Sequence, residues 1–375
     1  PKILWTQKHE SELFASIDKV VLPKDFIRYK LTGQFFSDVS DASGTSLLDV
    51  GKRNWSAEMF DALGWPITWM PEVTESTEAS TEISEDASRL TGLLAGTPVI
   101  AGGGDQAAQA VGCGIVEEGL VSTTLGTSGV VFAQSDEYRV EPSGNLHAFW
   151  PAVPGKWHLM GVMLSAAGSF QWYKNQFGQE EQRKEDGGGS NAYDLLTEEA
   201  ETVAAGSEGL FFLPYLSGER TPYPDPYARG CFIGMSLRHS KKHHTRAVLE
   251  GVSYGLNDSL SLMRDLGINP NEIILSGGGS RSALWKQMLA DVFSTRCTMV
   301  NALEGAAYGA ALLAAVGVGA FTSVQEACRS CIQKTETVSP GSDQETYQKH
   351  YPIYQSLYPS LKTQFAQIAD VITRD

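Results

Sequence analysis

An apolar run that ends in three glycines and leads into a helical pattern occurs twice in this 375-residue chain. The first is TPVIAGGGDQAAQAVGCG, Thr97 to Gly114, and the second is EIILSGGGSRSALWKQMLADVF, Glu272 to Phe293. Glycine at the end of a strand permits unusual backbone angles and the close approach of another molecule. Strands that alternate with helices in this way predict an α/β fold whose functional sites lie at the turns.

A third glycine turn joins two β-rich runs in LVSTTLGTSGVVFAQ, Leu120 to Gln134, and predicts a hairpin. Main-chain N–H groups in a turn without obstructing Cβ atoms can bind a phosphate, and the hydroxyls of Thr127 and Ser128 would add donors. A hairpin turn without chemical significance is the alternative here, and simple strand-to-helix packing is the alternative for SGGGSR. None of the turns matches GxxxxGK[ST] or GxGxxG, which disfavours a P-loop or a Rossmann site.

Asp105 follows the first glycine turn directly. A carboxylate at the end of a strand can reach a bound substrate and accept the proton of a hydroxyl that attacks a phosphoryl group. The alternative is an aspartate that only caps the helix predicted over Gln106 to Val111.

Other segments give coarser predictions. Residues 1–96 are expected to be mostly helical, and the polar run GQEEQRKEDGGGSNAYD, Gly178 to Asp194, is expected to be a surface loop. Gly305 to Phe321 is the longest uncharged run, and its small residues favour a buried helix packed closely on a neighbour over a membrane span. The tail predicts an amphipathic helix interrupted at Pro352 and Pro359.

Composition excludes several functions. The formal net charge of −15 would repel nucleic acid and anionic membranes. Five cysteines, an odd number, argue against a disulfide framework and for a reducing cytoplasm. Cys328 and Cys331 have CxxC spacing, but no second pair or matching histidines follow, so we interpret them as helix cysteines and predict no resident metal site.

In this order, the three turns resemble the FGGY family of carbohydrate kinases over essentially the whole chain. Four passages carry the resemblance: PKILWTQKHE, GGGDQAAQAVGCG, GERTPYPDPYARGCFIGMSLRHSKKHHTRAVLEG and SGGGSRSALWKQMLADVF. SDVSDASGTSLLDV and FLPYLSGERTP are similar to the xylulose branch of that family.

The resemblance implies an α/β architecture of two actin-like, ribonuclease H-like domains with an interdomain cleft. Residues 1–116 would be the remainder of the N-terminal domain, and residues 117–375 the C-terminal, nucleotide-binding domain. Family members begin with a strand pair that bears a DxGT-type phosphate loop. That part is not in this sequence, so the first domain is expected to be incomplete, and activity of the chain alone is in doubt.

The resemblance also implies transfer of the γ-phosphoryl group of ATP, with Mg²⁺, to D-xylulose. Asp105 would be the general base, Asp105 and Gln106 would bind the sugar, and the glycines before Asp105 would clear space for sugar and nucleotide. The residues expected to hold ATP are Gly126, Thr127, Ser128, Gly278, Gly279 and Ser282. The expected partners are therefore a small-molecule sugar and ATP, without nucleic acid or membrane, and a homodimer is common in similar proteins. The alternatives are another acceptor, such as gluconate, ribulose or glycerol, or a non-catalytic sugar-binding relative, for which a base would be unnecessary.

Overall fold

The computed structural model describes residues 1–302 and 305–372, and the chain divides into two compact units. Unit 1 consists of Pro1–Val116, Phe149–Trp157 and Glu304–Cys331. Unit 2 consists of Glu117–Ala148, His158–Leu303 and Ile332–Asp375. Two later segments therefore join the N-terminal residues in unit 1, an arrangement that the order of the sequence does not indicate.

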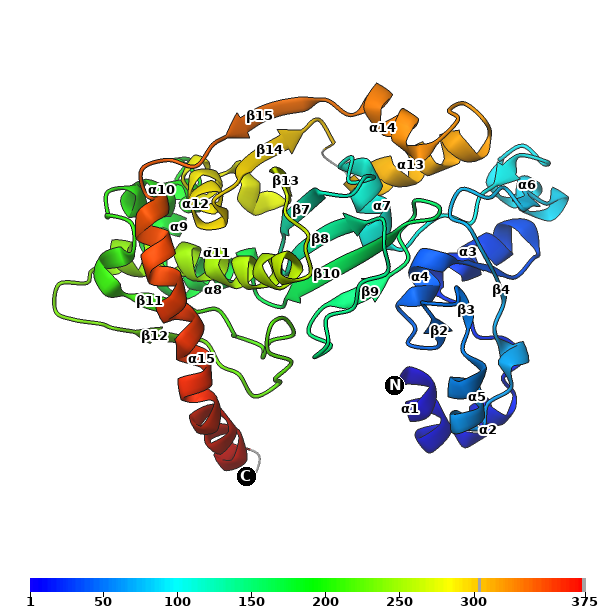
Figure 1. Cartoon of the computed structure of the whole chain (residues 1–375), viewed down its shortest axis with the longest axis horizontal. Helices are drawn as coiled ribbons and strands as arrows, with labels where there is room; N and C mark the ends of the chain where they lie inside the picture. Colours follow the sequence, from blue (N-terminus) through cyan, green and yellow to red (C-terminus); the bar gives the residue numbers. More distant parts are fainter. Residues whose placement is uncertain (303–304, 373–375) are drawn as a thin grey trace. The chain divides into compact units, whose positions relative to one another are not determined.

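Unit 1 begins with helices and short strand pairs (Figure 1). The helices before residue 96 are α1 (Lys2–His9), α2 (Ser11–Ala15), α3 (Pro23–Thr32), α4 (Val39–Ser43), α5 (Ala57–Leu63) and α6 (Glu85–Thr91). The strand pairs are β1 (Phe36–Asp38) parallel to β4 (Glu72–Thr74), β2 (Leu48–Asp49) antiparallel to β3 (Asn54–Trp55), and β5 (Thr81–Glu82) antiparallel to β6 (Pro98–Val99). These helices cover 42 of the first 96 residues, so helix is the main regular structure here, but the prediction of a mostly helical segment is wrong.

In the same unit, α7 (Asp105–Gly112) and α13 (Gly305–Gly317) pack main chain against main chain. A Cβ on Gly112 would overlap the carbonyl oxygen of Gly305, and a Cβ on Gly309 would overlap that of Ala108. The predicted close packing of this run on a neighbouring helix is confirmed, but the helix is not buried as predicted, since only Gly309, Leu312 and Leu313 of α13 are buried. Cys328 and Cys331 lie on the next helix, α14 (Val324–Cys331). Among the residues described, no helix combines the length and apolar character needed to cross a membrane.

Unit 2 is built on a seven-stranded sheet with the order β15-β14-β13-β7-β8-β10-β9. Its strands are β7 (Leu120–Leu125), β8 (Gly129–Ser135), β9 (His147–Phe149), β10 (Trp157–Met163), β13 (Glu272–Ser276), β14 (Arg296–Val300) and β15 (Lys334–Val338). Strand β13 is parallel to both β7 and β14, whereas β15 is antiparallel to β14. The predicted hairpin is confirmed, because β7 and β8 are antiparallel with Leu125 opposite Gly129.

Helices pack on this sheet around one large core. Helix α11 (Lys241–Asp265) is buried along most of its length and contacts β8 (Figure 1). The other elements of the unit are α8 (Ala167–Phe177), α9 (Gln179–Asp186), α10 (Ala192–Glu201), α12 (Ala283–Phe293), α15 (Gln344–Ile372) and the antiparallel pair β11 (Phe211–Leu213) and β12 (Cys231–Ile233). The strand–turn–helix prediction for residues 272–293 is confirmed by β13 and α12.

Two predictions in unit 2 are wrong. The polar run over residues 178–194 is mostly helical, because the apolar face of α10, with Ala192, Leu196 and Ala200, is buried in the unit. Helix α15 continues through both prolines. A proline inside a helix costs about 3 kcal/mol, and burial of large side chains on α15, each worth about 1.5–3 kcal/mol, offsets that cost. These side chains are Tyr347, Tyr354, Tyr358 and Phe365.

Candidate functional site

Asp105 is the first residue of α7, and it is exposed to solvent. Gly104 occupies the N-cap position, and Asp105 Oδ1 accepts a hydrogen bond from the N–H of Gln106 at 2.7 Å. Asp105 is therefore not the capping residue that the alternative interpretation requires. A negative charge is favourable here because a helix N-terminus carries partial positive charge. An exposed carboxylate on a fixed helix end can accept a proton from a bound hydroxyl.

Each of the three positions before Asp105 favours glycine for a different structural reason. Gly102 has a φ of +79°, which other residues seldom adopt. A Cβ on Gly103 would lie 3.4 Å from Ser40 Oγ, and a Cβ on Gly104 would lie 3.3 Å from Asp41 Oδ1. Gly103 and Gly104 thus face helix α4 rather than open space, which corrects the expectation that all three glycines clear room for ligands.

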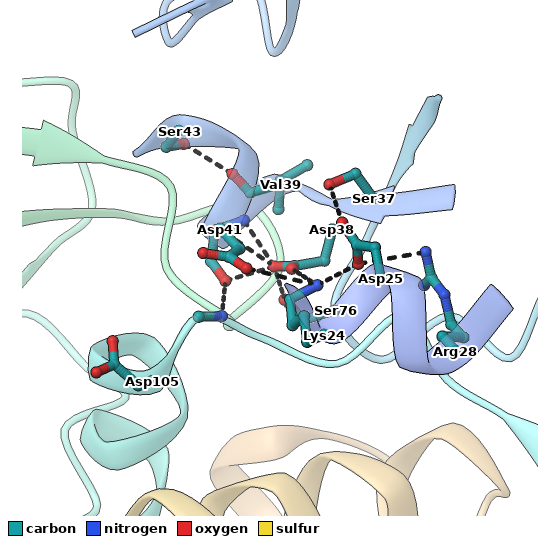
Figure 2. A network of polar contacts seen from close by, with 12 residues as sticks. Lys24, Asp25, Arg28, Ser37, Asp38, Val39, Asp41, Ser43, Ser76 and Asp105 are labelled. Carbon is teal, nitrogen blue, oxygen red and sulfur yellow. Dashed lines mark hydrogen bonds and ion pairs between the residues drawn. The ribbon is translucent and has the colours of Figure 1, made fainter. Parts of the chain in front are cut away.

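Helix α4 is anchored by a buried ion pair (Figure 2). Asp38 caps α4, because its Oδ2 accepts hydrogen bonds from the N–H groups of Ser40 at 2.8 Å and Asp41 at 3.3 Å. Lys24 Nζ on α3 lies 2.6 Å from Asp38 Oδ1 and 2.6 Å from Asp25 Oδ1. Burial opposes the charge on Lys24, but the two carboxylates raise the pKa of Lys24 above its ordinary value. Lys24 is therefore charged.

Asp41 lies on α4 beside this anchor. Burial raises the pKa of Asp41 to about 6, Lys24 opposes the shift, and the charges of Asp38, Asp25 and Asp105 add to it. The Asp41 side chain is 31% exposed, and its Oδ2 is 3.9 Å from Lys24 Nζ. Strongly perturbed pKa values are typical of functional sites, and the raised pKa of Asp41 occurs close enough to Asp105 for the two charges to interact.

In unit 2, the two other glycine turns form one site because β7 and β13 are neighbouring parallel strands. The carboxyl ends of parallel strands meet at the same edge of a sheet. Thr124 and Ser276, 152 residues apart, pair across the strands with hydroxyl oxygens 3.0 Å apart. Gly277 follows with a φ of +85°, and a Cβ there would lie 2.6 Å from the carbonyl oxygen of Leu125. Only glycine fits this contact between the turns.

A cavity of about 590 Å³ lies beside these turns. This volume is within the range of roughly 300–1,000 Å³ that is usual for small-molecule sites. A Cβ on Gly278 would meet no atom within 4 Å, whereas Gly279 packs against Leu125 and Trp285. The predicted nucleotide-site residues that line the cavity are Gly126, Thr127, Gly278, Gly279 and Ser282.

The rest of the cavity wall comes mainly from residues that were not predicted to bind the nucleotide. They lie on α8, on or just before α10, and beside Ser282: Gln171, Asn191, Tyr193, Asp194, Thr197 and Arg281. The local signal for the α10 residues was Asn191, whose Oδ1 accepts a hydrogen bond from the N–H of Tyr193 at 2.9 Å. Asparagine is a preferred N-cap, so this position marks a helix start inside the expected loop.

The turn after β7 offers two main-chain donors to an anion. The N–H of Gly126 donates to the carbonyl of Ser128 at 3.1 Å, whereas those of Thr127 and Ser128 have no hydrogen-bond partner among the described residues. The Ser128 hydroxyl donates to the carbonyl of Leu164 at 3.2 Å. The residues present therefore fit a nucleotide, with phosphate at the N–H groups of the turn and the rest of the ligand in the cavity.

Comparisons with known proteins show which family the chain resembles. The FGGY family of carbohydrate kinases matches through its N-terminal domain at residues 1–112 and its C-terminal domain at residues 121–318. The chain is 40% identical to the xylulose kinase of Escherichia coli over 96% of this chain and 72% of that enzyme. It is 29% identical to the gluconokinase of Bacillus subtilis over 98% of this chain and 72% of that enzyme. The crystal structure of a xylulose kinase from Brucella ovis superposes with a TM-score of 0.88 and 37% identity over 97% of this chain and 73% of that chain.

Proposed function

Because this chain belongs to the FGGY family of carbohydrate kinases, we propose that it transfers the γ-phosphoryl group of MgATP to the C5 hydroxyl of D-xylulose. The products are D-xylulose 5-phosphate and ADP. The coarser assignment, a carbohydrate kinase that uses ATP, follows from the family. The observation that carries the choice of acceptor is the 40% identity to the E. coli xylulose kinase over 96% of the chain.

Asp105 acts as the general base in this proposal. As the C5 oxygen forms its bond to the γ-phosphorus, the hydroxyl proton passes to a carboxylate oxygen of Asp105. The bond from the γ-phosphorus to the bridging oxygen breaks, and its electron pair leaves with ADP. Gln106, the next residue of α7, hydrogen-bonds the sugar in this proposal, and its N–H donates to Asp105 Oδ1.

The cavity of unit 2 holds the nucleotide in this proposal. The N–H groups of Thr127 and Ser128 bind phosphate oxygens, Gly278 leaves room for adenosine, and Ser282 lies near the base. Charge spreads over the phosphoryl oxygens during transfer, so fixed main-chain donors stabilise the transition state without reorganising. Mg²⁺, which usually enters such sites on the nucleotide phosphates, neutralises part of that charge.

We assign the two domains by the same reasoning. Residues 1–116 are the remainder of the family's N-terminal domain, and residues 117–375 are its C-terminal, nucleotide-binding domain, although two segments of the latter, Phe149–Trp157 and Glu304–Cys331, belong to unit 1. The family matches at residues 1–112 and 121–318 support this boundary.

The test is ADP release from the purified protein with ATP and a panel of sugars, in the wild type and in Asp105→Asn. We expect D-xylulose to give the highest kcat/KM, and Asp105→Asn to lower kcat by roughly 10²–10⁴-fold while the Kd for ATP changes little. Glu85→Gln is the matched control, because Glu85 is an exposed carboxylate at the first position of another helix, α6. Full activity in Asp105→Asn, or equal losses in both variants, would refute the general-base role.

Gluconate is the second candidate acceptor, and the 29% identity to the B. subtilis gluconokinase over 98% of this chain favours it. The sugar panel separates the two candidates directly. A higher kcat/KM for gluconate than for D-xylulose would replace the acceptor in the proposal and leave the role of Asp105 unchanged.

A further inference from the structure

The main-chain N–H of Gly104, the residue directly before Asp105, donates a hydrogen bond to a side chain on another helix. The acceptor is Ser40 Oγ on α4, at 3.0 Å and 64 residues away in the sequence. Ser40 is 6% exposed. The start of a helix leaves N–H groups without partners inside the helix, and Gly104 is the N-cap of α7. This single bond therefore ties the start of α7 to α4.

The orientation of the Ser40 hydroxyl is determined by its other partner. The hydroxyl donates its hydrogen to Asp38 Oδ2, which also accepts the N–H of Ser40 at 2.8 Å. Because a carboxylate takes the hydrogen, the lone pairs of Oγ are left to accept from Gly104. A hydroxyl polarised in this way is also a better acceptor. Asp38 is in turn fixed by Lys24 Nζ at 2.6 Å, so the acceptor of the Gly104 bond rests on a buried ion pair.

Steric contact fixes the same segment from a second direction. The positions that a Cβ would take on Gly103 and Gly104 lie 3.4 Å from Ser40 Oγ and 3.3 Å from Asp41 Oδ1. The main chain before Asp105 therefore lies between a hydrogen bond and close packing, both supplied by α4. The next hydrogen bonds of this main chain lie on either side, from the N–H of Gly102 to the carbonyl of Ser76 at 2.9 Å and from the N–H of Ala108 to the carbonyl of Gly104 at 2.9 Å. Loss of the bond to Ser40 therefore leaves the peptide plane between Gly103 and Gly104 without its own hydrogen bond.

We propose that Ser40 is a positioning residue for phosphoryl transfer, which acts through Gly104 to hold the start of α7 and the Asp105 carboxylate in line with the acceptor hydroxyl. This inference rests on the proposed function of Asp105. A purely local role of Ser40 in α4 requires only its bonds to Asp38, whereas the bond to Gly104 joins two helices. A displacement of a reacting group by about 1 Å can lower a rate by about 10²-fold.

The experiment compares Ser40→Ala with Ser76→Ala. Ser76 is also fully buried, and its hydroxyl donates to the same Asp38 Oδ2 at 3.2 Å. Each variant removes one hydroxyl from Asp38, but only Ser40→Ala removes the acceptor of the Gly104 N–H. The measurements on each variant are kcat, KM for sugar and ATP, the melting temperature, and hydrogen exchange of peptides that cover residues 101–112.

We expect Ser40→Ala to lower kcat by roughly 10–100-fold, to change KM for ATP by less than about twofold, and to accelerate exchange at the start of α7. Ser76→Ala should stay within about threefold of the wild-type kcat, with unchanged exchange in this segment. Equal kcat losses in the two variants, or wild-type exchange at the start of α7 in Ser40→Ala, would overturn the proposal. Ser40→Cys, which keeps a weaker acceptor, replaces Ser40→Ala if the latter does not fold.

The result for Ser40 can be distinguished from the results that test the acceptor sugar and the role of Asp105. If the protein prefers another sugar, the choice of D-xylulose fails, and the Ser40 and Ser76 variants are compared with that sugar instead. If Asp105→Asn keeps full activity, both the base and its positioning by Ser40 are refuted.

Discussion

Asp258, on α11, is a buried carboxyl group that connects this helix to α15. Its Oδ1 accepts hydrogen bonds from the Tyr351 hydroxyl at 2.7 Å and from Gln355 Nε2 at 3.2 Å. Its Oδ2 has no hydrogen-bond partner among the described residues. Burial raises the pKa of Asp258 to about 7 from an ordinary value of 3.8, against the opposing effect of the two hydrogen bonds. The group is therefore largely neutral in the folded protein below pH 7.

The shift predicts how stability depends on pH. In the unfolded chain Asp258 has its ordinary pKa of 3.8. Between that value and about pH 7 the folded state keeps a proton that the unfolded state has lost, so a rise in pH favours unfolding. The contribution of Asp258 to the free energy of unfolding falls by about 1.4 kcal/mol per pH unit, or roughly 4 kcal/mol between these two pKa values. Above about pH 7 the contribution is constant. Asp258→Asn keeps an acceptor for Tyr351 and removes the ionisation.

We therefore expect the free energy of unfolding of Asp258→Asn, relative to wild type, to rise from about pH 4 to about pH 7 and then to level off. The assay is urea denaturation followed by circular dichroism across this range. Any packing cost of the substitution is independent of pH and cancels from the slope. Asp265→Asn, which makes the same change at an exposed position at the end of the same helix, is the control. A constant difference between Asp258→Asn and wild type would refute the reasoning.

Two further substitutions test the core and the nucleotide turns. Glu250→Gln removes the buried carboxylate that lies 2.9 Å from Nε of the buried Arg246 and leaves Arg246 only the exposed Asp343 carboxylate at 3.6 Å, so it should lower the free energy of unfolding by about 3–5 kcal/mol. In denaturation the exposed control Glu345→Gln should match wild type, and an equally small effect of Glu250→Gln would contradict this. Gly277→Ala forces a side chain into a φ of +85° against β7, and should both lower the melting temperature and weaken ATP binding by at least about tenfold in calorimetry. Its neighbour Gly278→Ala, whose Cβ would face open space, should keep the wild-type melting temperature, and identical melting of the two variants would contradict the assignment.

The parts of the fold that the sequence predicted are those fixed by local chemistry. The hairpin over Leu120 to Gln134 and the helix that starts at Asp105 follow from turn residues and apolar periodicity within a short window. Helix α15 was predicted wrongly at Pro352 and Pro359, because the compensation comes from burial against the rest of unit 2, which no local window contains.

The same distinction applies to the candidate sites. Asp105 could be found because a single carboxylate follows a glycine turn. Ser40 could not, because its partner Gly104 is 64 residues away and the bond depends on the packing of α4. One local signal was present, since Asp38 precedes a short helix as a typical N-cap residue. The pairing of Asp38 with Lys24 has no counterpart in the spacing of the sequence.

In both candidate sites a glycine allows another element to approach the main chain closely. Gly104 lets Asp41 of α4 approach the main chain before Asp105, and Gly277 lets the turn after β13 lie against Leu125 of β7. At Gly277 the contact is between two main chains, which have no rotamers to order when a ligand binds, whereas the main chain at Gly104 contacts the side chains of Ser40 and Asp41. A Cβ on Gly277 would overlap the main chain of β7 and displace one turn from the other, whereas a Cβ on Gly104 would require only a small shift of the Asp41 side chain. Gly278 is the useful contrast, because its open face predicts an effect on ligand affinity alone.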